Sequence, residues 1–321
     1  MVLSIILPVY NMDTFVKKCI HSIIDFCPNH MHIEVIAVND GSTDNSLDEL
    51  RSIDDKRLRI IDQPNAGVSS ARNRGLEEAS GDYVWLIDPD DYLSDNFIVE
   101  VYNLLIKKAP EMLLFGINWV DEDKLLGKRE YPAGEFTVPE IMTMRIYDSN
   151  VWSRVIKRQL IEAHGIRFID VINGEDFEFC IKVFCHTKKV IIPEIIGYNY
   201  LTNPNGSSKK RAQTHLENLA SHSVKTLEYL RVYFESSKGK LTTAPEVFKP
   251  WVNNNIFGLL YSLYRFNYTI PFTKSILASL SKDGQYPVSS QGLGKKQKLF
   301  LSVANKQSIF LPLLKFKRHI G

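Results

Sequence analysis

The first hundred residues alternate between short apolar runs and longer segments with helical spacing, and this pattern constrains the fold more than any other feature of the sequence. The apolar, β-branched runs cover residues 2–9, 33–38, 57–62 and 82–88. The helical patterns lie near residues 13–26, 44–52, 69–79 and 94–108. Because parallel strands are joined by crossover helices, the alternation predicts an α/β fold of Rossmann type, with a mostly parallel sheet flanked by helices.

Beyond residue 112 the alternation weakens, and the pattern changes again near residue 210. Shorter strands are expected at residues 112–117, 151–156, 188–192 and 196–201, and helices at 138–146, 158–164 and 175–185. These mixed elements indicate that the sheet gains antiparallel strands. We therefore expect an α/β domain over residues 1–205, followed over residues 206–321 by a mainly helical C-terminal region with a basic tail.

The basic tail stands out from the rest of the chain. All 37 acidic residues lie at or before Asp283, whereas residues 284–321 carry seven Lys or Arg. The tail has a formal charge of +7 and the preceding residues −5, which together give the net charge of +2. Interleaved with apolar clusters such as residues 311–314, this charge predicts binding to an anionic membrane surface. A solvated segment, or a tail folded onto the acidic part of the chain, are the open alternatives.

The remaining composition predicts a cytoplasmic protein that lies peripherally on the inner face of the cell membrane. No stretch of 18 apolar residues exists, and the N-terminus lacks the basic segment of a signal peptide. The four cysteines have neither CxxC nor zinc-site spacing, so we expect reduced packing residues. No nucleic-acid partner is expected, because the acidic part of the chain offers no basic groove.

Polar residues follow each of the first four predicted strands. They occupy residues 8–11, 39–44, 63–73 and 88–91. The carboxyl ends of parallel strands meet at one edge of a sheet, and ligands bind there. The sequence thus gathers carboxylates, amides and an arginine at one edge.

The most distinctive of these segments is Asp88-Pro89-Asp90, which follows a buried strand. Residues i and i+2 point the same way on leaving a strand, so the two carboxylates form a hard-oxygen site for Mg²⁺ or Mn²⁺. A metal there would neutralise a diphosphate leaving group. The alternative is a simple Pro/Asp turn.

Three further positions have both a functional and a structural interpretation. Asp40 could accept from the ring N–H of a base, or belong to an Asp-Gly turn. Arg72, near a helix start capped by Ser69, could hold a diphosphate, or be a surface arginine. The pair Glu175-Asp176 opens a helix, where one carboxylate could take a proton from a hydroxyl or both could complement the helix dipole.

Taken in order, these segments resemble the family 2 glycosyltransferases, which have the GT-A fold. The resemblance rests on segments 8–11, 39–44, 65–73, 88–91 and 174–176 and covers about residues 1–205. It implies an inverting transferase that moves a sugar from a nucleotide-diphosphate donor, with a UDP-sugar favoured, to a saccharide or lipid-linked saccharide. Synthesis of a cell-surface polysaccharide or glycolipid is the implied setting, with Mn²⁺ or Mg²⁺ as cofactor.

The resemblance also implies roles for individual residues. The donor would contact Pro8, Tyr10, Asp40, Arg72 and Asp88. The metal pair would be Asp88 and Asp90, with Asp90 favoured as the direct ligand. The catalytic base would be Asp176, with Glu175 beside it. The acceptor side would include Trp152, Tyr198 and Tyr200.

One base is enough for an inverting displacement, in which the acceptor oxygen attacks opposite the leaving diphosphate. A nucleotidyltransferase, which also needs a metal and an α/β sheet, is the competing enzyme class. A dehydrogenase or P-loop protein loses support because the sequence has neither GxGxxG after a strand nor GxxxxGK[ST]. A binding module without activity would require these carboxylates to be vestigial.

Overall fold

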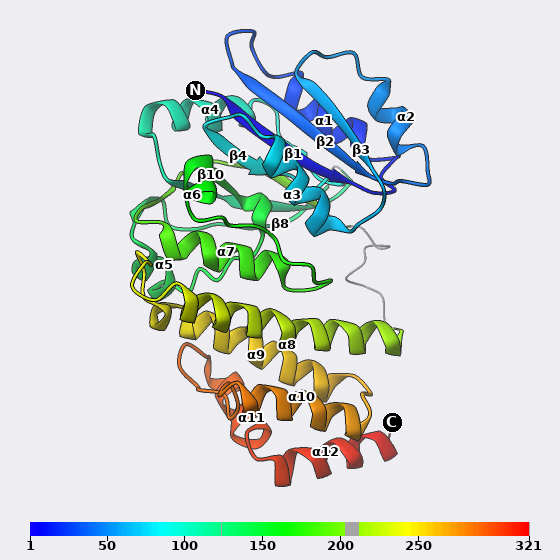
Figure 1. Cartoon of the computed structure of the whole chain (residues 1–321), viewed down its shortest axis with the longest axis vertical. Helices are drawn as coiled ribbons and strands as arrows, with labels where there is room; N and C mark the ends of the chain where they lie inside the picture. Colours follow the sequence, from blue (N-terminus) through cyan, green and yellow to red (C-terminus); the bar gives the residue numbers. More distant parts are fainter. Residues whose placement is uncertain (123, 203–211, 321) are drawn as a thin grey trace. The chain divides into compact units, whose positions relative to one another are not determined.

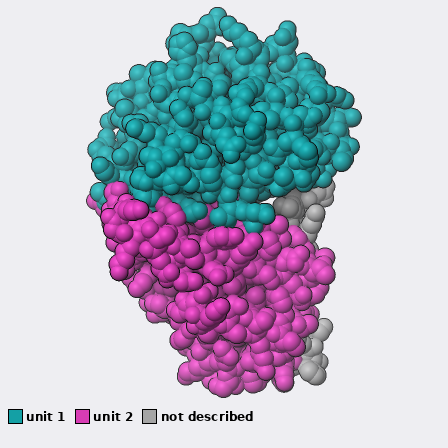
Figure 2. All heavy atoms as spheres, in the orientation of Figure 1, with its two compact units in different colours: residues 1–138, 148–170, 179–204 teal, residues 139–147, 171–178, 205–321 magenta. Residues whose placement is uncertain are grey.

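A computed structural model describes residues 1–122, 124–202 and 212–320 (Figure 1). The chain forms two compact units, each built from separate segments (Figure 2). Unit 1 comprises residues 1–138, 148–170 and 179–204, and unit 2 comprises residues 139–147, 171–178 and 205–321. The boundary predicted between residues 205 and 206 lies outside the described residues.

The larger sheet of unit 1 has the strand order β3-β2-β1-β4-β10-β6-β11-β9. The strands are β1 Leu3–Val9, β2 Ile33–Asp40, β3 Leu58–Gln63, β4 Tyr83–Leu86, β6 Met112–Leu114, β9 Gly134–Phe136, β10 Arg154–Lys157 and β11 Val190–Ile192. β1 pairs in parallel with β2 and β4, and β2 with β3, which confirms the predicted parallel core. β10 runs antiparallel to β4 and β6, as expected for the later strands.

The parallel strands form the core because helices cover them. Every residue of β1 and of β4 is buried, which explains why these runs are apolar without polar alternation. The helices of unit 1 are α1 Val16–Ile24, α2 Ser46–Arg51, α3 Val68–Glu78, α4 Phe97–Lys108 and α6 Arg158–Ala163, together with residues 179–186 of α7 Glu175–His186. α3 packs on β1 and β2 (Figure 1), and a Cβ at Gly75 would clash with Cγ2 of Ile6. Glycine at this position therefore permits the close approach of α3 to the sheet.

The prediction of one strand at residues 112–117 is wrong, because the chain changes sheets there. β6 ends at Leu114, and β7 (Gly116–Asp121) joins a second sheet of order β5-β12-β7-β8. Its other strands are β5 Tyr92–Leu93, β8 Lys124–Arg129 and β12 Ile196–Leu201. A Cβ at Gly116 would clash with the carbonyl oxygen of Arg129, so the crossing is sterically restricted to glycine.

Unit 2 is mainly helical, as predicted for the C-terminal region. Its helices are α5 Val138–Thr143, α8 Gln213–Ser236, α9 Lys249–Arg265, α10 Ile270–Lys282, α11 Lys295–Ala304 and α12 Gln307–Ile320, together with the 3₁₀ turn η3 Pro245–Phe248. α8 contacts α9 and α10 (Figure 1). α9 also contacts α11, and α10 also contacts α12. None of the helices in the described ranges has the length and apolar character needed to cross a membrane.

Candidate functional site

The Asp88-Pro89-Asp90 segment lies just beyond β4, held by an arginine from α3. Asp88 is half-buried, and its Oδ1 accepts a hydrogen bond of 3.1 Å from Nη2 of Arg72. Arg72 is 4% exposed, and its guanidinium lies over the ring of Phe168 at 5.3 Å. Unit 1 therefore brings two predicted donor residues, Arg72 and Asp88, into direct contact.

The folded protein disfavours the ionised form of Asp90. Burial, and then the charge of Asp88, raise the pKa of Asp90 from its ordinary value of 3.8 to about 6. Two neighbouring carboxylates in a half-buried loop are suited to sharing one cation.

We expect this effect to appear in the stability of the metal-free protein. Since the folded state disfavours ionised Asp90, stability falls as the pH rises from about 4 to about 6, by up to about 3 kcal/mol for two pKa units. Asp90 is partly exposed, so a loss of about 1–2 kcal/mol is the expected size. In chelator at pH 7.5, Asp90→Asn should therefore unfold at higher urea than the wild type, and at pH 4 the two should coincide. Equal urea midpoints at pH 7.5 would contradict this assignment.

The next carboxylate, Asp91, has a different role that the sequence did not reveal. It is buried, and accepts hydrogen bonds from the hydroxyl of Tyr198 at 2.6 Å and the backbone N–H of Leu201 at 2.9 Å. Burial, then the charges of Asp88 and Asp90, raise the pKa of Asp91 well above its usual range. Asp91 thus fixes β12 to the loop; the only signal in the sequence is a third carboxylate after the Asp88/Asp90 pair.

The carboxylate of Asp40 is occupied by the chain itself. It accepts hydrogen bonds from Nε2 of Gln63 at 2.7 Å, and from the backbone N–H groups of Ala66 at 2.9 Å and Gly67 at 2.8 Å. Gly67 has φ of +89° and directly precedes α3. Asp40 therefore holds the loop from which α3 starts, a short distance before Arg72.

Pro8 and Tyr10 lie at the end of β1. Pro8 is buried within the strand, whereas Tyr10 follows it and is 45% exposed. The next residue, Asn11, accepts a hydrogen bond from the backbone N–H of Thr43 at 2.8 Å and donates its own N–H to Ser42 Oγ at 3.1 Å. These bonds join the loops after β1 and β2, and leave the Tyr10 side chain at the surface of this edge.

The three predicted acceptor residues form one aromatic stack. Trp152 lies parallel to Tyr198 at 4.6 Å between ring centroids, and to Tyr200 at 5.4 Å. Tyr198 is completely buried and Trp152 nearly so, whereas Tyr200 is half-buried. Of the three rings, Tyr200 is thus the one with surface left for a ligand.

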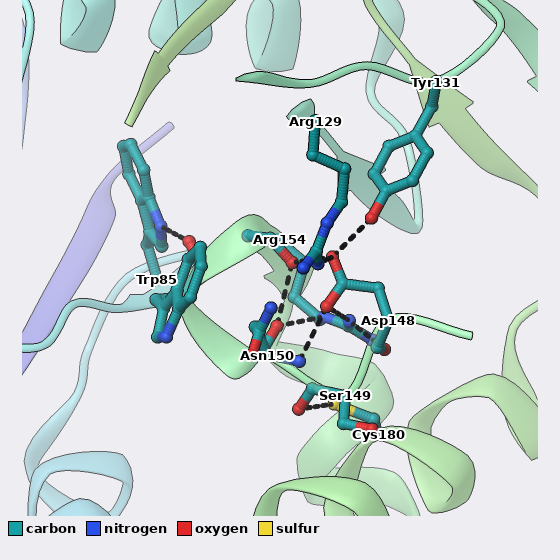
Figure 3. A network of polar contacts seen from close by, with 10 residues as sticks. Trp85, Arg129, Tyr131, Asp148, Ser149, Asn150, Arg154 and Cys180 are labelled. Atoms are coloured by element: carbon teal, nitrogen blue, oxygen red, sulfur yellow. Dashed lines mark hydrogen bonds and ion pairs between the residues drawn. The ribbon is translucent and has the colours of Figure 1, made fainter. Parts of the chain in front are cut away.

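A polar network around the buried Asp148 and Arg154, shown in Figure 3, holds the turn at residues 148–154. Asp148 accepts hydrogen bonds from the hydroxyls of Tyr131 at 2.8 Å and Ser153 at 2.9 Å, and lies 3.4 Å from Nη1 of Arg129. Nη2 of the fully buried Arg154 donates to the Asp148 carbonyl at 2.6 Å. The carbonyl of Trp152 in turn accepts from the indole of Trp85 on β4 at 2.8 Å. The network ties this turn to the strand that leads into Asp88.

Glu175 and Asp176 belong to unit 2. α7 (Glu175–His186) begins with them, directly after Gly174, which has φ of +93°. Both are half-buried. The predicted helix start is confirmed, and the pair stands in its first turn.

Residues 4–162 match the family model described as Glycosyl transferase family 2. The chain belongs to the family 2 glycosyltransferases. The match includes the Asp88/Asp90 loop, Asp40 and Arg72, and it ends before Glu175.

Curated relatives of this family 2 glycosyltransferase agree with that result. It is 30% identical to Glycosyltransferase GlyA of Streptococcus pneumoniae over 204 residues, which are 59% of this chain and 29% of GlyA. It is 26% identical to a Poly(ribitol-phosphate) beta-glucosyltransferase of Bacillus spizizenii over 226 residues, 68% of this chain and 35% of that protein. The chain thus spans about a third of the length of these two relatives.

Solved structures confirm the GT-A-like fold predicted for this family 2 glycosyltransferase. S. aureus TarS 1-349 in complex with UDP-GlcNAc superimposes with a TM-score of 0.61 at 17% identity, over 99% of this chain and 92% of that one. The mannosyltransferase PcManGT of Pyrobaculum calidifontis, in complex with GDP-Man and Mn²⁺, gives a TM-score of 0.53 at 17% identity, over 98% and 86%.

Proposed function

We propose that this chain transfers a sugar from a nucleotide diphosphate, with a UDP-sugar favoured, to an acceptor hydroxyl. The observation that carries the proposal is the half-buried Asp88/Asp90 loop after β4, in contact with Arg72. A diphosphate needs positive charge around its oxygens. Arg72 on α3 offers a guanidinium that can bind two oxygens, and the loop offers two carboxylates suited to a cation. The UDP-GlcNAc held by TarS supports uracil as the base.

A divalent metal fits the donor set of this loop. Burial, and then the charge of Asp88, raise the pKa of Asp90, and a bound cation would favour its ionised form. Within the described residues no group of three or more Asp, Glu, His or Cys side chains could hold a metal, so phosphate oxygens would complete the coordination. Asp88 and Asp90 would therefore hold Mg²⁺ or Mn²⁺, which when bound stabilises negative charge on the diphosphate. PcManGT, which holds Mn²⁺, supports this choice.

The chain's own residues would then complete a single displacement. Arg72 binds and orients the diphosphate, and Asp176 takes the proton of the acceptor hydroxyl. The acceptor oxygen forms its bond to the anomeric carbon as the bond to the diphosphate oxygen breaks, and that oxygen keeps the electron pair. Attack opposite the leaving group inverts the anomeric configuration.

The proposed acceptor is a saccharide or a lipid-linked saccharide in cell-surface polysaccharide or glycolipid synthesis. The relation to a Poly(ribitol-phosphate) beta-glucosyltransferase supports a cell-surface polymer. In unit 1, the exposed part of the Tyr200 ring could stack on a sugar, with Trp152 behind it.

Release of free nucleoside diphosphate tests this function. We would incubate the full chain with UDP-, GDP- and CMP-linked sugars, with Mn²⁺, Mg²⁺ or chelator, and measure UDP, GDP or CMP. Metal-dependent release from one UDP-sugar supports the proposal. Formation of a nucleotide-sugar from a sugar phosphate and UTP would instead identify a nucleotidyltransferase.

We also propose that α11 and α12 attach the protein to an anionic membrane surface, on the inner face of the cell membrane. Their exposed apolar side chains include Leu299, 73% exposed, and Phe316, 66% exposed. Ile309, Leu313 and Phe316 share one side of α12, at i, i+4 and i+7. Lys295 and Lys296 are exposed one turn before Leu299, so charge and apolar surface occur together on α11.

Flotation with lipid vesicles checks this attachment. Each lysine contributes about 1 kcal/mol near an anionic surface, so replacing Lys295, Lys296 and Lys298 with Ala should weaken partitioning about 10²-fold. Substitutions are preferable to deleting the tail, because Phe310 of α12 is buried and packs on Phe300. Leu299→Ser, which removes an exposed apolar side chain of α11, should also weaken binding. Leu126→Ser, at an exposed apolar residue of β8, is its matched control and should not. Equal binding to neutral and anionic vesicles, or none to either, would remove the membrane role.

A further inference from the structure

The loop that precedes Asp176 is attached to the middle of α8. The backbone N–H of Ile172 donates to Nδ1 of His222 at 2.9 Å, and Nδ2 of Asn173 donates to Oγ of Ser223 at 2.8 Å. The hydroxyl of Thr226 lies 3.1 Å from the Asn173 carbonyl and 2.9 Å from the carbonyl of His222, so its single proton is shared between the loop and the preceding turn of α8. Three side chains from adjacent turns of one helix thus bind two consecutive residues of the loop.

Gly174 brings this loop into close contact with Thr226. A Cβ at Gly174 would lie 2.8 Å from Oγ1 of Thr226, and the residue has φ of +93°. The Gly174 carbonyl then accepts the backbone N–H of Glu178 at 3.0 Å, in the first turn of α7. Asp176 therefore lies in a helical turn that begins at Gly174, and the loop that leads into this turn is held by α8.

α8 is a long helix that packs on its neighbours along the side that includes Thr226, the partner of this loop. It is 24 residues long, and Thr226 is buried on the side that also buries Leu216, Ala220, Leu227 and Leu230. The helix packs on α9 and α10. Loss of the Thr226 hydroxyl would remove its bond to the loop together with its bond to the His222 carbonyl, while the packing of α8 on α9 and α10 would remain.

We propose that Thr226, supported by His222 and Ser223, is a positioning residue for Asp176, so that the helical region sets the place of the catalytic base. This inference rests on the proposed function, in which Asp176 is that base. Proton transfer requires the carboxylate to be within hydrogen-bond reach of the acceptor hydroxyl, and a displacement of about 1 Å can lower the rate about 10²-fold. Loss of the Thr226 hydroxyl frees the Asn173 carbonyl and loosens the residues before Asp176.

Thr226→Val tests the inference, since it keeps the shape of the side chain and removes the hydroxyl. We expect kcat to fall by about 10- to 10²-fold with the KM for the donor unchanged, and Thr226→Ser to restore kcat. The matched control is Thr273→Val on α10, a fully buried threonine whose hydroxyl donates to the Thr269 carbonyl at 2.9 Å. Both valine variants lose a buried hydroxyl, but the control should keep the wild-type kcat. Hydrogen exchange of residues 171–178 should accelerate in Thr226→Val alone.

The double variant with Asp176→Asn separates this inference from the proposed function. If Thr226 acts through Asp176, then Thr226→Val should cost almost nothing further in the Asp176→Asn background. Additive losses, or equal kcat values for Thr226→Val and Thr273→Val, would overturn the inference while leaving Asp176 as the base. Wild-type kcat in Asp176→Asn would overturn the base assignment, and a loss in Thr226→Val would then show that Thr226 acts through another group.

Discussion

Asp90→Asn should abolish sugar transfer, by at least about 10³-fold, while the protein stays folded. Several kcal/mol of transition-state stabilisation depend on positive charge at the leaving diphosphate, and about 4 kcal/mol corresponds to 10³-fold. The substitution removes one of the two carboxylates proposed to hold that charge. Product formation under saturating donor and Mn²⁺, with circular dichroism to verify folding, is the measurement.

Asp95→Asn provides the control for this experiment, because Asp95 is an exposed aspartate a few residues further along the same segment. It should retain wild-type activity. Full wild-type activity in excess chelator would refute the metal assignment even if Asp90→Asn were inactive, since Asp90 would then act without a cation.

Asp176→Asn should lower kcat by at least about 10²-fold, the usual contribution of a general base, while donor and metal binding persist. Asparagine is close in size to aspartate but cannot accept the acceptor proton. We therefore expect kcat to fall while donor affinity stays at the wild-type value. Donor affinity is measured from the shift of the melting temperature with added UDP-sugar.

Glu175→Gln is the matched variant, one residue earlier in the same helical turn. If it is the more damaging change, the base is Glu175 and Asp176 is the wrong member of the pair. If Asp176→Asn abolishes donor binding as well as turnover, Asp176 would be a donor ligand or a determinant of the helix start.

The parallel part of the fold could be predicted because its signals are local. β1 and β4 are buried along their whole length, so each appears in the sequence as an uninterrupted apolar run. The carboxyl ends of such strands meet by topology, so the strand pattern alone is enough to place Asp40 and Asp88 at one edge. The change of sheets at Gly116 has no such local signal, because it depends on the approach of the Arg129 carbonyl.

The contacts of the candidate site could be predicted far less well. The sequence shows that Asp40 follows a strand, but not that Gln63, Ala66 and Gly67 occupy its carboxylate. Asp91 binds Tyr198 across 107 residues, and Asp148 gathers donors from other segments of unit 1. Such partners are determined by the packing of distant segments, and they cannot be predicted from the spacing or periodicity of residues in the sequence.

The attachment of residues 172–174 to α8 has a practical consequence for making shorter versions of this protein. A fragment that stops at residue 205 retains every family motif, yet it leaves Ile172 without His222, and Asn173 without Ser223 and Thr226. It also strips Trp251 from Tyr147 and Phe177, two aromatic neighbours in unit 2. Expression trials and domain exchanges should therefore keep residues 139–147, 171–178 and the helices from α8 onward together. Separating them would expose apolar rings and remove the contacts that hold the residues before Glu175 and Asp176.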